Sequence, residues 1–283
     1  MLIRTKTAGK VGFSGRWLLA AAFCAASALA FGVTPASADV LEDIKRDGRL
    51  LVGVTDNSPP FSSRNMGDKV SVGYDVDLAE LIAQRLGVPM VQVTLRNQDR
   101  ISFLMEGKVH LVAVGMSRTA ERAKSIDFSY AYLDSPHKII VRKDANLTSM
   151  HQLADRTLAL NKGASVDDEL KAAVPTIKLV NYDNYELCFQ AVKGRRVDAF
   201  LADQVLLLAM AQKDSNPDDY MLIPDYDGPR TSGFGLPKGE ARFKAFVNAT
   251  LLDMEASGRA ESLFGKWFGG TKRSFRIVPD KDY

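Results

Sequence analysis

Cysteine and histidine are scarce in this sequence, with two cysteines and three histidines in 283 residues. Cys188 is the only cysteine after residue 38, so that part of the chain has no second cysteine for an internal disulfide. His110, His137 and His151 do not cluster with the spacing of metal ligands. We therefore expect no metal, no cofactor, and a fold held together by its hydrophobic core.

Long apolar runs are missing after residue 38, and the one before it has the pattern of an export signal. Four basic residues and no acidic one precede an uncharged, apolar run at 17–33, and Ala36-Ser37-Ala38 offers the small residues that a signal peptidase recognises. The sequence predicts a signal peptide over 1–38, cleavage after Ala38, and a mature protein in the periplasm.

Two other interpretations of this segment are weaker. A retained membrane anchor needs about 20 strongly apolar residues, whereas this run is diluted by Ala, Gly, Ser and Pro. Lipidation at Cys24 would require a small residue before it, and Phe23 is large.

A strong excess of either charge is also missing. The full chain has 37 basic and 34 acidic residues, and removal of 1–38 leaves 33 and 34, a net charge of −1. The basic character belongs to the leader, so charge gives no support for a nucleic-acid or membrane-surface partner.

β-rich runs alternate with amphipathic helical patterns through the remaining residues. We expect strands at 50–54, 91–95, 109–114 and 197–202, and helices at 75–86, 100–106, 205–212 and 241–268. Repeated β-α-β units predict mainly parallel sheets flanked by helices, with ligands at the carboxyl ends of the strands. Two isolated extended segments, 137–142 and 231–236, are the expected crossings between a first lobe, 39–136 plus 237–283, and a second lobe, 137–236.

Arg122 follows the predicted strand 109–114, with Thr119 as a plausible N-cap. A cation in the first turn of a helix is unfavourable unless it faces an anion that the free N–H groups also bind. The alternative is a solvated arginine paired with Glu121 or Asp127, and on these residues alone both interpretations stay open.

Asp203 presents a similar choice at the end of the strand 197–202. It is either an ordinary helix N-cap or an acceptor for a ligand ammonium group. With Arg122 on the other lobe, it would supply the opposite charges that a zwitterionic α-amino acid requires.

Several segments together resemble the polar amino-acid-binding branch of the periplasmic solute-binding proteins, family 3. They occur in that family's order and cover nearly all of the chain after the leader: Leu51-Val52-Gly53-Val54, Pro59-Pro60-Phe61, Gly73-Tyr74-Asp75-Val76-Asp77-Leu78-Ala79, Thr119-Ala120-Glu121-Arg122, Ile126-Asp127-Phe128-Ser129, Asp198-Ala199-Phe200, Gly233-Phe234-Gly235-Leu236, Ser257-Gly258 and Lys266-Trp267-Phe268-Gly269. The resemblance implies a two-lobed type II binding-protein fold with two hinge strands.

The resemblance also implies roles for individual residues. Arg122 would hold the ligand α-carboxylate with help from Ser117, and Gly115 and Asp203 would take the α-ammonium group. A second-lobe loop containing Gly163 and Ser165 would close over the ligand.

The resemblance also indicates which positions of the first lobe would contact the side chain of the ligand. Asn57-Ser58-Pro59 and Asn97 stand where members with large ligands place aromatic rings. Arg100 is similar to an arginine that glutamate/aspartate-binding members use for the distal carboxylate, although Thr55 replaces a further arginine of that subgroup. Arg100 could instead be a helix-surface residue paired with Asp99 or Glu106. An acidic amino acid is the leading ligand and a polar neutral one the second.

The expected role is ligand capture by hinge closure and delivery to the permease and ATPase subunits of an ABC importer, as a monomer. A dehydratase of prephenate-like substrates would need a carboxylic acid in the cleft, for which Glu186 is the only candidate. A receptor lobe would need a following membrane span, which we do not find before Tyr283. Tyr185 stands where the glutamate/aspartate subgroup places a polar ring, and His110 is expected to pack rather than bind.

Overall fold

The computed structural model describes residues 39–64, 67–226, 228, 230–269, 273 and 275–280. The expected signal peptide, its cleavage site and Cys24 lie outside these residues. Residues from Asp39 onward form one compact unit.

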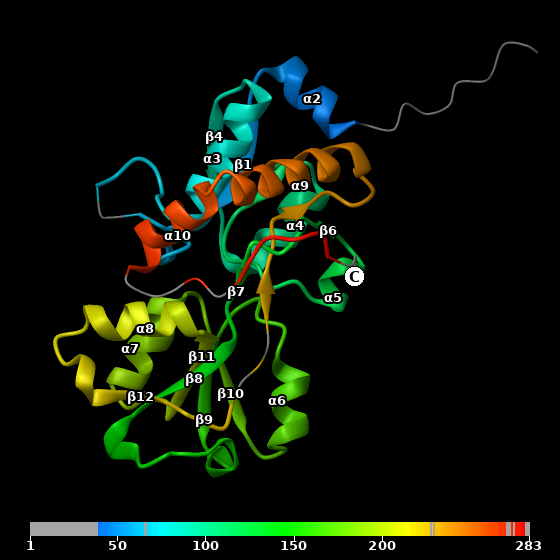
Figure 1. The fold of residues 1–283 in the computed structure, drawn as a ribbon. Coiled ribbons are helices and arrows are strands. Elements are labelled where there is room, and N and C mark those ends of the chain that lie inside the picture. The colour runs from blue at the N-terminus through cyan, green and yellow to red at the C-terminus, as the bar shows by residue number, and fades with distance from the viewer. Residues whose placement is uncertain are drawn as a thin grey trace, which may run out of the picture. The chain divides into compact units, whose positions relative to one another are not determined.

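The first sheet has the strand order β4-β1-β5-β14-β6. Figure 1 labels β4, β1 and β6 of this sheet. Its strands are β1 (Leu50–Val54), β4 (Met90–Thr94), β5 (Leu111–Val112), β6 (Asp127–Phe128) and β14 (Gly235–Leu236). β1 runs parallel to β4 and β5, whereas β14 is antiparallel to β5 and β6 because it belongs to the returning chain. A two-stranded hairpin, β2 (Asn57–Ser58) and β3 (Ser62–Ser63), follows β1.

The helices of this part are α2 (Val40–Asp47), α3 (Tyr74–Leu86), α4 (Arg100–Met105), α5 (Ala120–Ala123), α9 (Ala241–Ala256) and α10 (Arg259–Phe268), with a 3-10 turn η1 (Asn97–Asp99) before α4. Asp39 and Thr119 cap two of them, α2 and α5, with their side chains. α3 buries Ala79, Ile82 and Ala83 and ends at Gly87, whose φ of 73° suits glycine. The expected single helix 241–268 is two helices, because Gly258 takes a φ of 75° between them.

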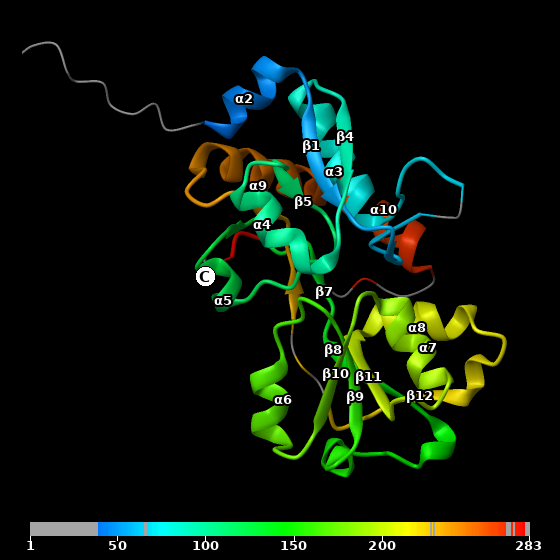
Figure 2. The ribbon, with the colours of Figure 1, turned by 180° about the vertical axis from the view of Figure 1, so that it is seen from behind.

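The second sheet has the order β10-β9-β11-β8-β12 (Figure 2). Its strands are β8 (His137–Arg142), β9 (Thr157–Asn161), β10 (Lys178–Tyr182), β11 (Ala199–Asp203) and β12 (Tyr220–Leu222). β9 is parallel to β10 and β11, whereas β8 is antiparallel to β11 and β12. Its helices are α6 (Asp167–Ala173), α7 (Tyr185–Lys193) and α8 (Gln204–Lys213), with 3-10 turns η2 (Lys143–Ala145), η3 (Met150–Leu153) and η4 (Pro217–Asp219).

The crossings differ from the expectation. Residues 137–142 are not an isolated segment but β8, with buried Ile139, Ile140 and Val141 inside the second sheet. The chain crosses instead through β7 (Leu133–Asp134) and returns through β13 (Thr231–Ser232), which pair with each other (Figures 1 and 2). The error arose because β8 is antiparallel and lacks the β-α-β pattern around it.

The C-terminal residues return to the crossing region (Figure 1). Ile277 is buried and donates from its N–H to Glu255 of α9, and Arg273 donates to the same carboxylate over 2.6 Å. The Asp280 carboxylate accepts from the buried guanidinium of Arg118 and from the N–H of Ala131, two residues before β7. Asp280 therefore links the C-terminal segment to the residues just before β7, one of the two strands that connect the sheets.

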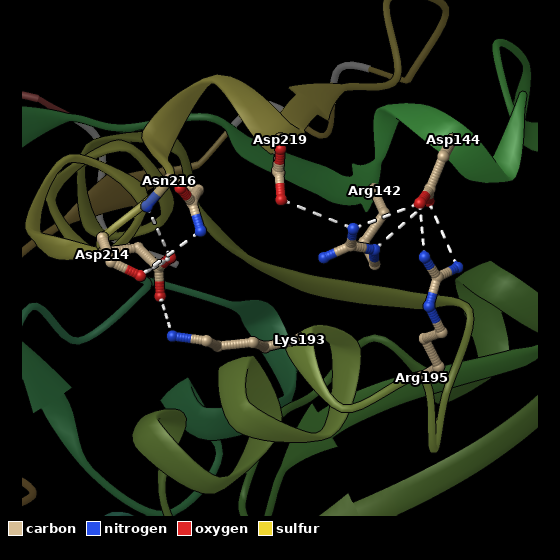
Figure 3. A network of polar contacts seen from close by, with 8 residues as sticks. Arg142, Asp144, Lys193, Arg195, Asp214, Asn216 and Asp219 are labelled. Carbon is tan, nitrogen blue, oxygen red and sulfur yellow. Dashed lines mark hydrogen bonds and ion pairs between the residues drawn. The ribbon is translucent and has the colours of Figure 1, made fainter.

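A surface network of charges joins the loops beside β8 and β12 (Figure 3). Arg142 donates to Asp144 and Asp219, Arg195 donates to Asp144, and Lys193 pairs with Asp214 over 2.6 Å. Asp144 and Asp219 are about half exposed, so their pairs contribute little to stability.

Candidate functional site

The guanidinium of Arg122 is buried at the junction of the two sheets. Thr119 caps α5 by accepting from the Arg122 N–H, and the side chain donates from Nη1 to the Ser117 carbonyl (2.8 Å) and from Nη2 to the Gly163 carbonyl (2.9 Å). The solvated alternative is wrong, because Glu121 pairs with Lys124 and Asp127 with Lys238. Burial, with Arg100 nearby, lowers the pKa of Arg122 to about 9.

Arg100 meets the same acceptor. Its Nε donates to the Asn97 carbonyl (2.6 Å), and its Nη2 to the Gly163 carbonyl (3.2 Å), with 5 % of the residue exposed. The helix-surface interpretation is wrong, because Asp99 pairs with Arg96 and Glu106 with Lys108. Two guanidinium groups that donate to one carbonyl oxygen form a site that favours the binding of an anion.

Gly163 brings the second-sheet loop against the first. Its φ is 86°, and a Cβ there would lie 2.9 Å from Gln98 Cα. Next to it, the Asn161 side-chain amide lies 3.1 Å from Asn97 Nδ2. Ser165, expected to contact the ligand, is exposed, so the loop approaches the arginines through the Gly163 carbonyl rather than through this hydroxyl.

Asp203 ends β11 and precedes α8, but its side chain makes no capping hydrogen bond. The residue is 4 % exposed, and its Oδ1 has no hydrogen-bond partner among the described residues. The ordinary N-cap interpretation is therefore wrong. Burial raises the pKa of Asp203 to about 7, partly offset by Ser135 and by Arg100.

Gly115 is held in place by the buried carboxylate of Asp75, which was not identified from the sequence as part of the site. Its N–H and the Tyr132 hydroxyl both donate to Asp75 Oδ2, and burial raises the pKa of Asp75 to about 7. Gly115 has a φ of 62°, and a Cβ there would lie 2.8 Å from the Phe61 ring. A backbone N–H cannot accept a hydrogen bond, so the Gly115 carbonyl is the only group of this residue that could take the α-ammonium group.

His137 was also missed as a site residue. Its Nε2 lies 3.4 Å from the Ser117 hydroxyl and 3.9 Å from Asp203 Oδ1, and the side chain is 12 % exposed. It lies directly opposite Asp203 in the β8–β11 register, a relationship that no local sequence pattern signals. His110, in contrast, accepts from the Leu51 N–H and belongs to the packing of the first sheet.

Buried polar atoms without partners gather where the two sheets meet. In the part of the chain that the structure describes, Asn97 Oδ1, His137 Nδ1, Asp203 Oδ1 and Ser232 Oγ lack hydrogen bonds. Such atoms are costly in a protein interior unless a ligand or water satisfies them. Their convergence beside two arginines indicates a site for a small polar, charged ligand.

A separate cavity of the first part of the structure does not include the charged residues of this site. This cavity of about 630 Å³ lies beside α5, β6 and α9 and is lined by Lys238 and Lys244 but by neither Arg122 nor Asp203. Among the described residues, no group of His, Cys, Asp and Glu could hold a metal ion, and no helix is long and apolar enough to cross a membrane.

Residues 50–270 match the bacterial extracellular solute-binding proteins, family 3. The chain belongs to this family. Among its relatives, the ABC transporter glutamine-binding protein GlnH of Bacillus subtilis is 28 % identical over 238 residues, 81 % of this chain and 84 % of that protein. The glutamate/aspartate import solute-binding protein of Escherichia coli is 26 % identical over 265 residues, 89 % and 86 %.

The fold agrees with this assignment. The crystal structure of a mutant of ArgBP from T. maritima superposes with a TM-score of 0.75 at 31 % identity, covering 81 % of this chain and 99 % of that one. The expected type II two-lobed α/β fold is confirmed. The relatives are amino-acid-binding proteins of ABC transporters, and this chain is a solute-binding protein of that kind rather than an enzyme. Glu186, the acid that a dehydratase would need, is exposed and accepts from Gln190.

Proposed function

We propose that this solute-binding protein captures an α-amino acid with an acidic side chain and delivers it to an ABC importer. The observation that carries the proposal is the presence of two buried arginines and a buried carboxylate, Asp203, whose Oδ1 has no hydrogen-bond partner among the described residues. A zwitterion places its carboxylate and ammonium within a few ångströms of each other, so it would satisfy both sides of the site.

The ligand carboxylate would replace the Gly163 carbonyl as acceptor of Arg122. Arg100 donates to the same carbonyl oxygen and therefore lies beside Arg122. Arg122 would bind the α-carboxylate of the ligand, and Arg100 would bind a second carboxylate on the ligand side chain. The glutamate/aspartate import protein of E. coli among the relatives supports an acidic cargo.

A polar neutral amino acid is the second candidate. Thr55, which stands in place of a further arginine, is buried and hydrogen-bonded with Ser62 of the β2–β3 hairpin, so it adds no cation. The glutamine-binding relative is consistent with this alternative.

In this proposal the leader 1–38 directs the chain to the periplasm, and the mature monomer closes by rotation of a first lobe, 39–136 plus 237–283, against a second, 137–236. β7 and β13 would absorb the rotation. Closure over the ligand would present the protein to the permease and ATPase subunits.

A thermal-shift panel of the twenty amino acids on residues 39–283 tests the proposal, since a ligand that binds only the native state raises the melting temperature. L-glutamate and L-aspartate should give the largest shifts, and Arg122→Ala should abolish them. A shift of undiminished size in Arg122→Ala, or none in the unaltered protein, would contradict the proposed site.

A further inference from the structure

Asp203 and His137 face each other across two strands of the second sheet. They are directly paired in the antiparallel β8–β11 register, so both side chains leave the sheet on the same face. β8 begins at His137, just after the crossing strand β7, and the hydroxyl of Ser117, a residue between β5 and α5, lies 3.4 Å from His137 Nε2. His137 is thus in contact with groups from both halves of the site.

The spacing of these groups leaves room for a shared donor. His137 Nε2 and Asp203 Oδ1 are 3.9 Å apart, too far for a hydrogen bond between them. Two acceptors that bind one nitrogen at about 2.9 Å each lie roughly 4–5 Å from each other. A donor between them would therefore complete the geometry with a small adjustment.

The imidazole is held in the form that can accept. Burial, together with Arg230 and Arg122, lowers the pKa of His137 to about 3, so the ring is neutral near pH 7. A neutral imidazole has one nitrogen with a free lone pair, whereas an ammonium group has three N–H donors and no acceptor.

We propose that His137 is a ligand-binding residue that accepts a hydrogen bond from the ammonium group of the amino acid, beside Asp203. This inference rests on the proposed function and extends it, because it assigns the group that the ring recognises. Since every α-amino acid carries that group, His137 contributes affinity without selecting the side chain.

The test compares His137→Leu and His137→Gln with the unaltered residues 39–283, using calorimetry with L-glutamate and with L-glutamine. Loss of a hydrogen bond to a charged group should weaken His137→Leu by about tenfold or more for both probes, and His137→Gln, whose amide oxygen still accepts, should lose less. Melting of each variant without ligand checks that it folds.

A double-mutant cycle separates this role from a merely structural one. If His137 and Asp203 bind the same ammonium group, His137→Leu should cost less in an Asp203→Asn background than in the unaltered protein. Independent effects would overturn the inference, as would a loss confined to one probe, which would mean that His137 contacts the side chain. If the unaltered protein binds none of the twenty amino acids, the proposed function has failed instead.

Discussion

Arg122 donates from Nη2 to the carbonyl oxygen of Gly163 over 2.9 Å, which joins the two halves of the site through one hydrogen bond between residues 41 positions apart. Arg100 donates to the same oxygen. The acceptor that a ligand carboxylate would replace is therefore a backbone group of the second half, and ligand entry must first free both arginines from it.

The two arginines should differ in what they recognise. Arg122→Lys should weaken L-glutamate and L-glutamine alike, by about thirtyfold or more, because a lysine cannot reproduce the forked geometry at a buried charged contact. Arg100→Gln should weaken L-glutamate at least about tenfold more than L-glutamine. Calorimetry measures the affinity of each variant for both ligands.

Arg96→Ala, at an exposed arginine paired with Asp99 on the neighbouring turn, is the control and should change neither affinity. Equal losses for the two ligands in Arg100→Gln would argue against an acidic cargo.

Close approach at Gly163 should be essential for tight binding. Gly163→Ala places a Cβ 2.9 Å from Gln98 Cα at a φ of 86°, so it should hold the loop away from Asn97 and weaken L-glutamate binding about tenfold or more. Gly239→Ala is the matched control, since its φ is 83° and its added Cβ would have no neighbour within 4 Å. Both variants carry a left-handed backbone cost of about 1 kcal/mol, so only the difference in affinity reports the steric contact. Equal affinities in the two would disprove it.

Stability of the ligand-free protein should fall as pH rises from about 4 to about 7. Burial raises the pKa of Asp75 and of Asp203 to about 7 from 3.8, so these two carboxyls hold more protons in the folded protein than in the unfolded chain in this window. They outweigh His137, whose lowered pKa has the opposite effect. The stability that each neutral carboxyl provides is complete below pH 4 and is lost through pH 7. Asp75→Asn and Asp203→Asn should each flatten the profile of unfolding free energy in urea, and an unchanged profile in both would contradict the assignment.

Ligand binding should release a proton near pH 6. An ammonium group placed beside Asp203 favours its ionised form, so the carboxyl that is mostly neutral in the empty protein loses its proton when the amino acid arrives. Calorimetry in two buffers of different ionisation enthalpy measures the proton count. Asp203→Asn should remove most of the release, whereas Asp75→Asn, at a carboxyl that binds Gly115 and Tyr132 instead of ligand, should retain it.

The C-terminal contact should stabilise the crossing region. Asp280→Ala removes a carboxylate partner from the Arg118 side chain, which is 4 % exposed. The substitution should lower the free energy of unfolding by about 2 kcal/mol. Asp219→Ala removes a half-exposed partner of Arg142 (Figure 3) and should change it by less than about 0.5 kcal/mol. Similar values for the two variants in denaturant titrations would mean that the C-terminal contact adds nothing.

Local patterns were enough to predict most elements and to mark two charged residues as candidates for the site. Apolar spacing and a following glycine predicted α3, and the run 50–54 predicted β1, because helix and strand periodicity depend on near neighbours in the chain. The places of Arg122 and Asp203 after strands made them candidates, because parallel sheets present their ligand-binding ends there, and the family resemblance supplied their expected roles. The lobe boundaries and the export signal stay predictions.

The sequence by itself thus determined the α/β class and the family, and it offered Arg122 and Asp203 as candidates for the site. Only the tertiary structure decided that Arg100 is buried against Gly163, 63 residues away, that Asp203 does not cap its helix, that Ser165 is exposed, and that His137 opens a sheet strand opposite Asp203. The physical reason is the same in each case. A buried polar group takes the partner that packing brings to it, and those partners come from segments whose separation in the chain leaves no local pattern.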